Sequence, residues 1–191
     1  TDIAEIRQVR NTFLDAQYRV QAGRQSFYEA QYKAVQEIED LFGEMEGEEF
    51  ITSVTGLWSA VSNLAQEPNN IVLRSELVST ASKFTERANA LRDQLVEYQT
   101  NMNQEVKNQV DQINDIVDQI RQYNELIQKY EATGESANDY RDSRNLLLDQ
   151  LSTYVNVESY EEVDGTVSIY AEGQFLLESN VQHRLTTANE S

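Results

Sequence analysis

Cysteine is missing from all 191 residues, and this absence excludes several kinds of chemistry. Disulfide bonds, thiol nucleophiles and thiolate zinc sites all need the sulfur that this chain lacks. The absence does not fix the compartment, because exported and cytosolic proteins can both do without cysteine. The sequence therefore rules out thiol chemistry and leaves the location open.

Proline and glycine are also scarce, with one proline and seven glycines in the whole chain. So few helix-breaking residues, together with 39% hydrophobic residues, indicate a folded chain that is neither disordered nor rich in loops. A chain of this length is expected to form one domain, with a small appendage at most. No run approaches the length of apolar residues that a membrane span needs, so we expect no membrane insertion.

Basic residues are the third shortage. The chain has 15 Lys and Arg against 33 Asp and Glu, a formal net charge of −18. Binding to nucleic-acid phosphates needs clustered Lys and Arg, and so does binding to an anionic membrane surface. We therefore expect neither a nucleic-acid partner nor a membrane partner.

One stretch without proline or glycine, residues 70–130, organises the rest of the chain. Its apolar residues recur in steps of four and three, which keeps them on one side of an α-helix. Between Tyr98 and Val110 all steps are of four, a stutter that locally relaxes a supercoil. A continuous helix here would be about 90 Å long, so we expect a rod. The predicted seam comprises Leu77, Ala81, Phe84, Ala88, Leu91, Leu95, Tyr98, Met102, Val106, Val110, Ile113, Val117, Ile120, Asn124 and Ile127.

Two further helices are predicted before this stretch, over residues 1–42 and 48–66. The break at Pro68 separates them from the long helix, which Asn70 can cap. The first has a seam of Ile6, Val9, Phe13, Ala16, Val20, Gly23, Phe27, Ala30 and Ala34, whose small residues allow close approach of a neighbouring backbone. The second has a face of Phe50, Val54, Leu57, Trp58, Val61, Leu64 and Ala65, where we expect Trp58 to lie in the core. The lengths support a three-helix rod but do not tell which pair is antiparallel.

The C-terminal part changes its pattern. Asn138 and Asp139 can start a short helix, and from Tyr154 the apolar residues alternate with a period of two, which indicates strands. A three-residue loop over residues 163–165 pairs Val157 with Ala171 and keeps one face less polar. We therefore predict a bulged type I turn with Gly165 in the left-handed conformation. Further strands are expected over residues 174–178 and 183–187.

The predicted fold class is mainly α: an elongated rod of long antiparallel helices in a coiled-coil-like bundle, with a small C-terminal antiparallel β region. The predicted domains are a helical rod over residues 1–152 and a small hairpin or sheet over residues 153–191.

No set of residues points to catalysis. The single histidine, His183, has no acidic partner at a recognisable spacing, so it is interpreted as a solvated strand residue. The acidic cluster of Glu44, Glu46, Glu48 and Glu49 lacks the ligand spacing of a calcium loop and is interpreted as a solvated turn. Asp142 and Arg144 are two positions apart and do not face each other on a helix, which favours a cap or a salt bridge between elements. We expect no enzyme, no metal and no cofactor.

Four stretches of the chain resemble one family, the flagellar hook-associated protein 1 family of the bacterial hook–filament junction. The stretches are residues 6–17 (IRQVRNTFLDAQ), residues 58–68 (WSAVSNLAQEP) with Arg74, residues 110–127 with their Val-x-x-Ile-Asn and Ile-x-x-Tyr-Asn-x-x-Ile patterns, and residues 142–152 (DSRNLLLDQLS). The chain departs from the usual family pattern at three places, namely Asn11-Thr12, Tyr123 and Asn145. The resemblance covers nearly the whole chain in order.

This resemblance implies a structural role without catalysis. Family members form a ring that joins hook to filament, so the implied partners are copies of the protein, the hook protein and the second junction protein. The resemblance also implies an extracellular position in the flagellum and export by the flagellar type III pathway without a cleaved signal peptide. The export chaperone would bind through a segment that this chain lacks, and we expect the chain to be a core piece. Possible subunit contacts are Arg10, Phe13, Leu14, Gln17, Arg74, Asp142 and Arg144.

Two alternatives remain beside this interpretation. The heptads alone would suit a generic coiled-coil scaffold, although the terminal strands and the broken middle helix count against it. An exported needle-tip or translocator protein of a virulence secretion system is also acidic and helical. A hydrolase or metalloenzyme has little support in the residues.

Overall fold

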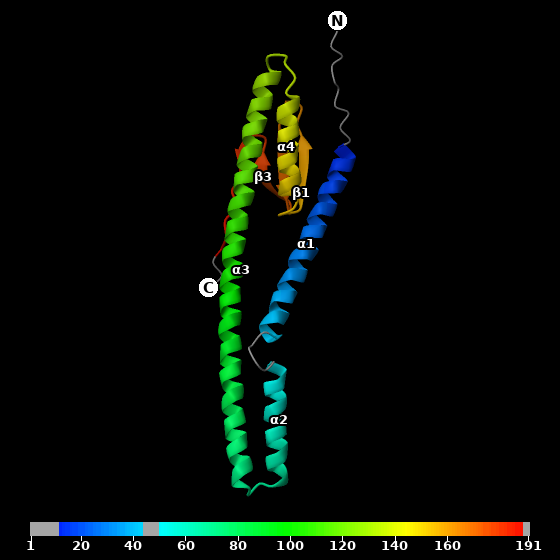
Figure 1. Cartoon of the computed structure of the whole chain (residues 1–191). Helices are drawn as coiled ribbons and strands as arrows, with labels where there is room; N and C mark the ends of the chain where they lie inside the picture. Colours follow the sequence, from blue (N-terminus) through cyan, green and yellow to red (C-terminus); the bar gives the residue numbers. More distant parts are fainter. Residues whose placement is uncertain (1–11, 44–49, 189–191) are drawn as a thin grey trace. The chain divides into compact units, whose positions relative to one another are not determined.

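The computed structural model describes residues 12–43 and 50–188. Four helices precede four strands along the chain (Figure 1). The helices are α1 (Thr12–Gly43), α2 (Phe50–Gln66), α3 (Ile71–Glu131) and α4 (Asn138–Leu151). The strands are β1 (Val157–Glu161), β2 (Val167–Ala171), β3 (Gln174–Glu178) and β4 (Val181–Gln182), which form one antiparallel sheet in that order. The predicted class, mainly helical with a small C-terminal antiparallel sheet, is confirmed.

The chain divides into two compact units, residues 1–30 with 105–191, and residues 31–104. The division within α3 lies between residues 104 and 105, inside the stutter that the sequence shows between Tyr98 and Val110. The boundary predicted at residues 152/153 lies inside the first unit, between α4 and β1. As a division between separately folding parts it stays a prediction.

In the unit of residues 31–104, α2 runs beside the first half of α3 (Figure 1). The ring of Phe50 at the start of α2 lies 5.8 Å from that of Phe84, and Gly56 faces Thr80, so the two helices are antiparallel. The predicted cap is confirmed: the side-chain oxygen of Asn70 accepts hydrogen bonds from the backbone N–H of Val72 at 3.0 Å and of Leu73 at 3.4 Å.

The face that α2 turns toward α3 differs from the predicted one. Trp58 is 72% exposed, so the prediction that it lies in the core is wrong. The buried positions of α2 are Ser53 and Ala60. These small side chains let the two backbones approach, as does Gly56, where an added Cβ would lie 3.8 Å from the Thr80 methyl group. Phe50, Leu57 and Leu64 of the predicted face are half-buried beside these small residues, whereas Val54, Trp58 and Val61 are exposed.

The predicted seam of α3 is largely confirmed. From Leu77 to Met102 every seam residue is buried or half-buried, and from Ile113 to Ile127 every one is buried. Val106 is the exception, because its side chain is exposed.

In the other unit, the second half of α3 and α4 cover one face of the sheet. The shared core takes residues from both helices and from three strands, and it comprises Ile113, Ile116, Val117, Ile120, Leu148, Leu151, Val157, Val167, Ile169, Ala171, Leu176 and Leu177. In β1 and β2 the core residues alternate with residues on the other face, as a sheet with one covered face requires. In β3 a register shift opposite Ile169 and Tyr170 leaves both Leu176 and Leu177 buried.

The β1–β2 hairpin has the predicted register. Val157 pairs with Ala171 and Ser159 with Ile169, and Gly165 has a φ of +82°, as a three-residue loop with a left-handed glycine requires. The third strand also lies where it is predicted. The fourth does not: β4 is Val181–Gln182, and residues 183–187 are not in a strand. The His183 backbone N–H still donates to the Leu176 carbonyl of β3 at 2.9 Å, and at Leu185 the backbone bonds instead to the Asn114 side chain of α3.

Candidate functional site

A buried polar network ties α4 to α3 and to the hairpin. Its centre is the guanidinium of Arg144, a residue that is 1% exposed. One terminal nitrogen, Nη1, donates to Asn124 Oδ1 at 2.9 Å and to the Gly165 carbonyl at 2.6 Å, and the other, Nη2, donates to Glu161 Oε1 at 3.0 Å. Burial lowers the pKa of Arg144 from its usual value. The predicted salt bridge between elements is confirmed for this residue.

Asn124 is the partner of Arg144 on α3, and it is fully buried. Its Oδ1 also accepts a hydrogen bond from the Val167 backbone N–H at 3.1 Å. Its Nδ2 donates to the Val167 carbonyl at 3.0 Å and to the Ser179 carbonyl at 2.7 Å. One side chain thus uses every donor and acceptor to fix the start of β2 and the β3–β4 turn against α3.

A second buried asparagine, Asn114, holds the C-terminal segment in the same way. Its side chain exchanges two hydrogen bonds with the backbone of Leu185, at 2.9 and 3.0 Å. The backbone carbonyl of Asn114 accepts a hydrogen bond from the Gln182 side chain at 2.7 Å. Asn114 and Asn124 therefore dock the strand region on α3 in one register.

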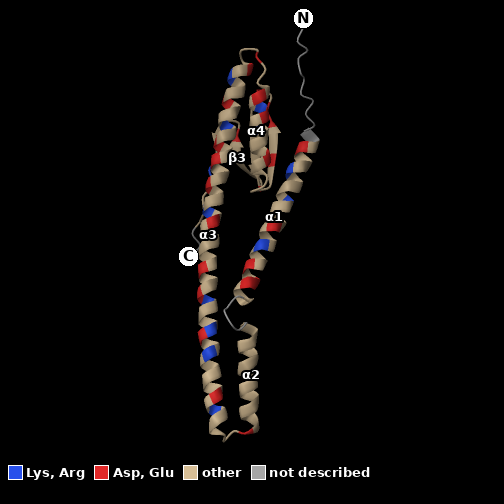
Figure 2. Cartoon of the chain, viewed as in Figure 1, with Lys and Arg blue, Asp and Glu red and all other residues tan. Residues whose placement is uncertain are grey.

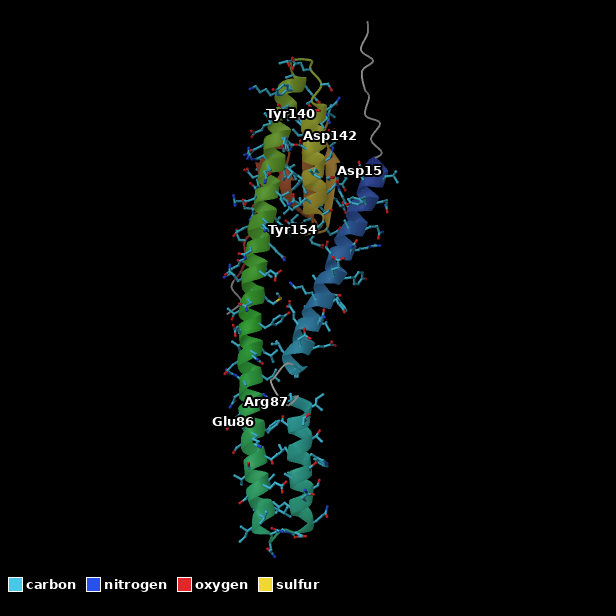
Figure 3. All side chains as sticks on the ribbon, in the orientation of Figure 1. Asp15, Glu86, Arg87, Tyr140, Asp142 and Tyr154 are labelled. Carbon is cyan, nitrogen blue, oxygen red and sulfur yellow. The ribbon has the colours of Figure 1, made fainter. Side chains whose placement is uncertain are left out.

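Arg141 forms a second set of ion pairs at the outer end of this network. Its Nε and Nη2 donate to the two carboxylate oxygens of Glu131, at 2.8 and 2.9 Å, and its Nη1 pairs with Glu161. These hydrogen bonds lower the pKa of Glu131 below its usual value. Next to this pair, Tyr140 of α4, labelled in Figure 3, packs its ring against Tyr130 and Tyr123 of α3 at 5.0 and 6.3 Å.

Acid should weaken this connection between α3 and α4. A carboxyl whose pKa is lower in the folded state stabilises that state above its unfolded pKa, and the contribution disappears as the pH falls through the lowered value. We expect the urea midpoint to fall as the pH is lowered from about 6 to about 3.5, and to fall less in Glu131→Gln, which has no carboxyl there to titrate. Glu135→Gln, an exposed change on the next loop, is the control and should follow the unsubstituted chain. An equal decrease of the urea midpoint in all three proteins would contradict a role of the Glu131 carboxylate in this pH dependence.

The N-terminal half of α1 is attached to the same unit by an ion pair and a close contact. Arg19 Nε donates to Asp149 of α4 at 2.8 Å, and its Nη1 donates to the Ser159 hydroxyl of β1 at 3.1 Å. One turn further, an added Cβ at Gly23 would lie 2.9 Å from the Ser152 carbonyl oxygen. The prediction that small residues of this helix allow close backbone approach is confirmed at Gly23. Of the rest of that seam, Ala16, Phe27 and Ala30 are exposed, so helix α1 is rotated from the predicted face toward Arg19.

Replacing Gly23 with alanine should detach α1 from α4. The substitution gains up to about 1 kcal/mol of helix propensity, but the clash with a backbone carbonyl costs about 1–3 kcal/mol. Gly56→Ala is the matched control, because it gains the same propensity and meets only an ordinary contact at 3.8 Å. We expect Gly23→Ala to be destabilising and Gly56→Ala to be neutral or stabilising in urea unfolding. Faster amide exchange confined to α1 would locate the effect, and equal behaviour of the two variants would refute the close contact.

The residues predicted as subunit contacts differ in their surroundings. Arg10 lies outside the described residues, and so does the side chain of Phe13. Leu14 is 60% exposed, and Gln17 is also exposed. Arg74 donates a hydrogen bond to the Pro68 carbonyl at 2.9 Å. Arg144 is the buried centre of the polar network described above. Asp142 is an exposed residue of α4 (Figure 3).

The exposed apolar side chains of α2 follow one another at helical spacing. Ile51, Val54, Trp58 and Val61, here named the α2 stripe, are 44–72% exposed. Figure 2 shows that α2 carries neither basic nor acidic residues, unlike the helices before and after it. Helix α1 has a second exposed apolar set, consisting of Leu14, Tyr18, Phe27, Tyr28, Tyr32, Val35, Ile38 and Phe42. Such surfaces mark sites of protein contact.

The described residues contain no group of three or more side chains that could hold a metal ion. None of the described helices is long and apolar enough to cross a membrane. The acidic cluster of residues 44–49 lies outside the described residues. His183 is half exposed, as predicted for a solvated residue, but it follows β4 and lies 3.8 Å from Glu178.

Sequence reasoning missed the roles of Arg19 and Glu161 and the clamping role of the two asparagines. A signal for Asn124 was present, because it stands at a position of the apolar seam where a polar side chain needs a buried partner. Asn114 directly follows the seam residue Ile113. Their partners are 20 to 71 residues away, a separation at which helical periodicity carries no information.

Comparison with known proteins agrees with this architecture. The family model of the flagellar hook-associated protein FlgK helical domain matches residues 35–191. The flagellar hook-associated protein 1 of Bacillus subtilis (strain 168) is 27% identical over 174 residues, which cover 91% of this chain and 34% of that protein. The flagellar hook junction protein FlgK of Burkholderia pseudomallei has a similar fold, with a TM-score of 0.74 and 22% identity over 88% of this chain and 30% of that one. The chain thus spans about a third of the length of these relatives.

Proposed function

The chain belongs to the flagellar hook-associated protein FlgK family, and from this membership we propose that it serves as part of the structural junction between the hook and the filament of a bacterial flagellum. The role is mechanical: subunits pack against one another and against their neighbours, without catalysis. The proposed partners are further copies of the protein in a ring, the hook protein on one side and the second junction protein on the other. The proposed location is extracellular, after export through the flagellar type III pathway without a cleaved signal peptide, with an export chaperone as a further partner.

The observation that carries this proposal is the uncharged, exposed α2 stripe in a chain with a net charge of −18. Ile51, Val54, Trp58 and Val61 form an exposed apolar surface. The free energy falls when another protein covers such a surface and removes it from water. Charged side chains would hinder the assembly of like subunits, and α2 has none. The α2 stripe is therefore the proposed subunit contact, with the exposed apolar residues of α1 as a second.

Of the predicted contact residues, Leu14, Gln17, Arg74 and Asp142 retain this role in the proposal because all four are exposed. Arg144 is buried and is assigned to the packing of the chain itself. A generic coiled-coil scaffold and a needle-tip protein receive no support from a specific observation, and membership of the hook-associated family argues against both.

The test uses the full-length protein that contains this chain, in its source bacterium. Deleting the gene should leave hooks without filaments, and restoring it should bring back filaments and swimming. Restoration with Trp58→Ser should fail or give few filaments, although the purified variant unfolds at the same urea concentration. Val163→Ser is the control: it removes an exposed apolar side chain at the tip of the hairpin and should restore motility fully. Normal motility in the deletion strain would refute the junction role, and full restoration by Trp58→Ser would refute the α2 stripe as the contact.

A further inference from the structure

The face of the sheet that the helices leave uncovered carries a row of aromatic rings. In β1, Val157 points into the core, so Tyr160 points to the opposite face. Its ring lies 5.8 Å from that of Tyr170 in β2, which lies 3.8 Å from Phe175 in β3, which in turn lies 6.4 Å from His183. These four residues, here named the aromatic row, cross the sheet from β1 to the segment after β4. Tyr160 and His183 at its ends are about half exposed.

Carboxylates surround the β1 end of the aromatic row. A shallow cavity of about 640 Å³ lies there, and the described residues that line it include Asn156, Glu158, Tyr160, Glu162, Tyr170 and Glu172 but no Lys or Arg. Two of the three carboxylates are held in place, since Glu158 accepts from the Tyr160 hydroxyl at 2.6 Å and Glu162 accepts from Ser168 at 3.2 Å. The hydrogen bond and charge of Glu158 raise the pKa of Tyr160, which agrees with a negative potential at this place. Glu178 adds a fourth carboxylate beside His183 at the far end.

The combination selects a particular chemistry. The flat guanidinium of arginine stacks on aromatic rings and forms paired hydrogen bonds with carboxylates, whereas the ammonium of lysine is a compact, strongly hydrated charge. Nucleic acids and anionic lipids would bring phosphates toward three carboxylates, which repels them. A second copy that packed the same face against this one would bring carboxylates toward carboxylates, which disfavours it as the occupant.

We propose that the aromatic row and its carboxylates bind an arginine-bearing segment of a different protein, with a guanidinium on the rings of Tyr160 and Tyr170 and its N–H groups toward Glu158 and Glu172. This contact is separate from the α2 stripe, which lies in the other compact unit, so it does not rest on the proposed junction role.

The test measures binding of a fluorescent hexapeptide, Gly-Arg-Val-Arg-Val-Gly with blocked ends, to the 191-residue chain at low salt. We expect saturable binding that weakens as salt is added. The same peptide with citrulline in place of arginine has the same shape without the charge, and it should bind at least roughly tenfold more weakly. A lysine peptide should bind less tightly than the arginine peptide.

Variants of the chain locate the site. The triple change Glu158→Gln, Glu162→Gln and Glu172→Gln should weaken binding roughly tenfold, and Tyr160→Ser should weaken it several-fold. The matched control makes the same change of net charge on exposed α3 carboxylates, with Glu76→Gln, Glu86→Gln and Glu97→Gln, and should leave the affinity unchanged.

Several results would overturn the proposal. They are no saturable binding, equal binding of the citrulline peptide, or an equal loss in the control triple variant, which would mean that only overall charge matters. Sedimentation of the two triple variants tests the remaining occupant. A change in self-association caused by the sheet-face variant alone would assign this face to a second copy and overturn the proposal as well.

Discussion

Replacing Arg144 with methionine should lower the free energy of unfolding by about 3–5 kcal/mol. The guanidinium satisfies Asn124 Oδ1, the Gly165 carbonyl and Glu161 at once, and methionine offers none of them a donor. Asn124 and the Gly165 carbonyl are buried, so water cannot replace the lost hydrogen bonds without opening the packing of α4 on the hairpin. Glu161 is nearly half exposed, so its share of the loss is the smallest.

The measurement is urea unfolding followed by circular dichroism, with Arg92→Met as the matched control. Arg92 also pairs with a carboxylate at 3.0 Å, that of Asp93, but both side chains are more than 70% exposed. Its replacement should therefore cost less than about 0.5 kcal/mol. The loss of stability in Arg144→Lys should lie between those of the two methionine variants. Lysine keeps the charge, but its single ammonium cannot reach the three acceptors that the planar guanidinium reaches. A loss below about 1 kcal/mol in Arg144→Met would mean that the network is not a determinant of stability.

The hairpin shows how far a sequence can specify a fold. A strand with one covered face allows only one parity of pairing, and that parity required a three-residue loop with a left-handed glycine. The observed pairs Val157–Ala171 and Ser159–Ile169 and the φ of Gly165 follow from that constraint. The cap at Asn70 was equally predictable, because capping depends on residues within one turn.

Trp58 shows where such reasoning ends. Helical periodicity finds apolar stripes, but α2 has two neighbouring ones, and hydrophobicity favours the one with the larger side chains. The chain packs a stripe that combines Ser53 and Ala60 with the half-buried Phe50, Leu57 and Leu64, because the small residues let α2 and α3 approach each other closely.

The candidate site was predictable only in part for a related reason. Leu14, Gln17 and Arg74 are exposed as a contact requires, whereas Arg144, a polar residue of a matched motif, is buried within the chain. A motif tells that a residue type suits a position, but its partner depends on distant segments. Arg144 bonds to residues 17 to 21 positions away on two other elements, and no local pattern contains that pairing.

Replacing Gly165 with alanine should cost about 3 kcal/mol, from two effects that can be separated. A side chain at a φ of +82° strains the backbone, and the added Cβ would also lie 2.9 Å from Arg141 Nη2 and from Glu131 Oε2. The substitution would therefore push apart the bidentate ion pair that joins α3 to α4, next to the carbonyl that accepts from Arg144.

Gly173→Ala is the control that isolates the first effect. Gly173 has a similar φ of +76°, but an added Cβ there would meet nothing within 4 Å among the described residues. Strain alone should cost about 1 kcal/mol at this position. The free energies of unfolding of the two variants, measured in urea, should therefore differ by about 2 kcal/mol, the cost of crowding at the ion pair.

Removing the Glu131 carboxylate beforehand, with Glu131→Ala, should reduce that difference, because it leaves room beside residue 165 and the ion pair is already lost. If the difference persisted unchanged, the crowding would come from Arg141 Nη2 or from the Ile127 methyl group, which lies 3.3 Å from the added Cβ, and not from the Glu131 carboxylate.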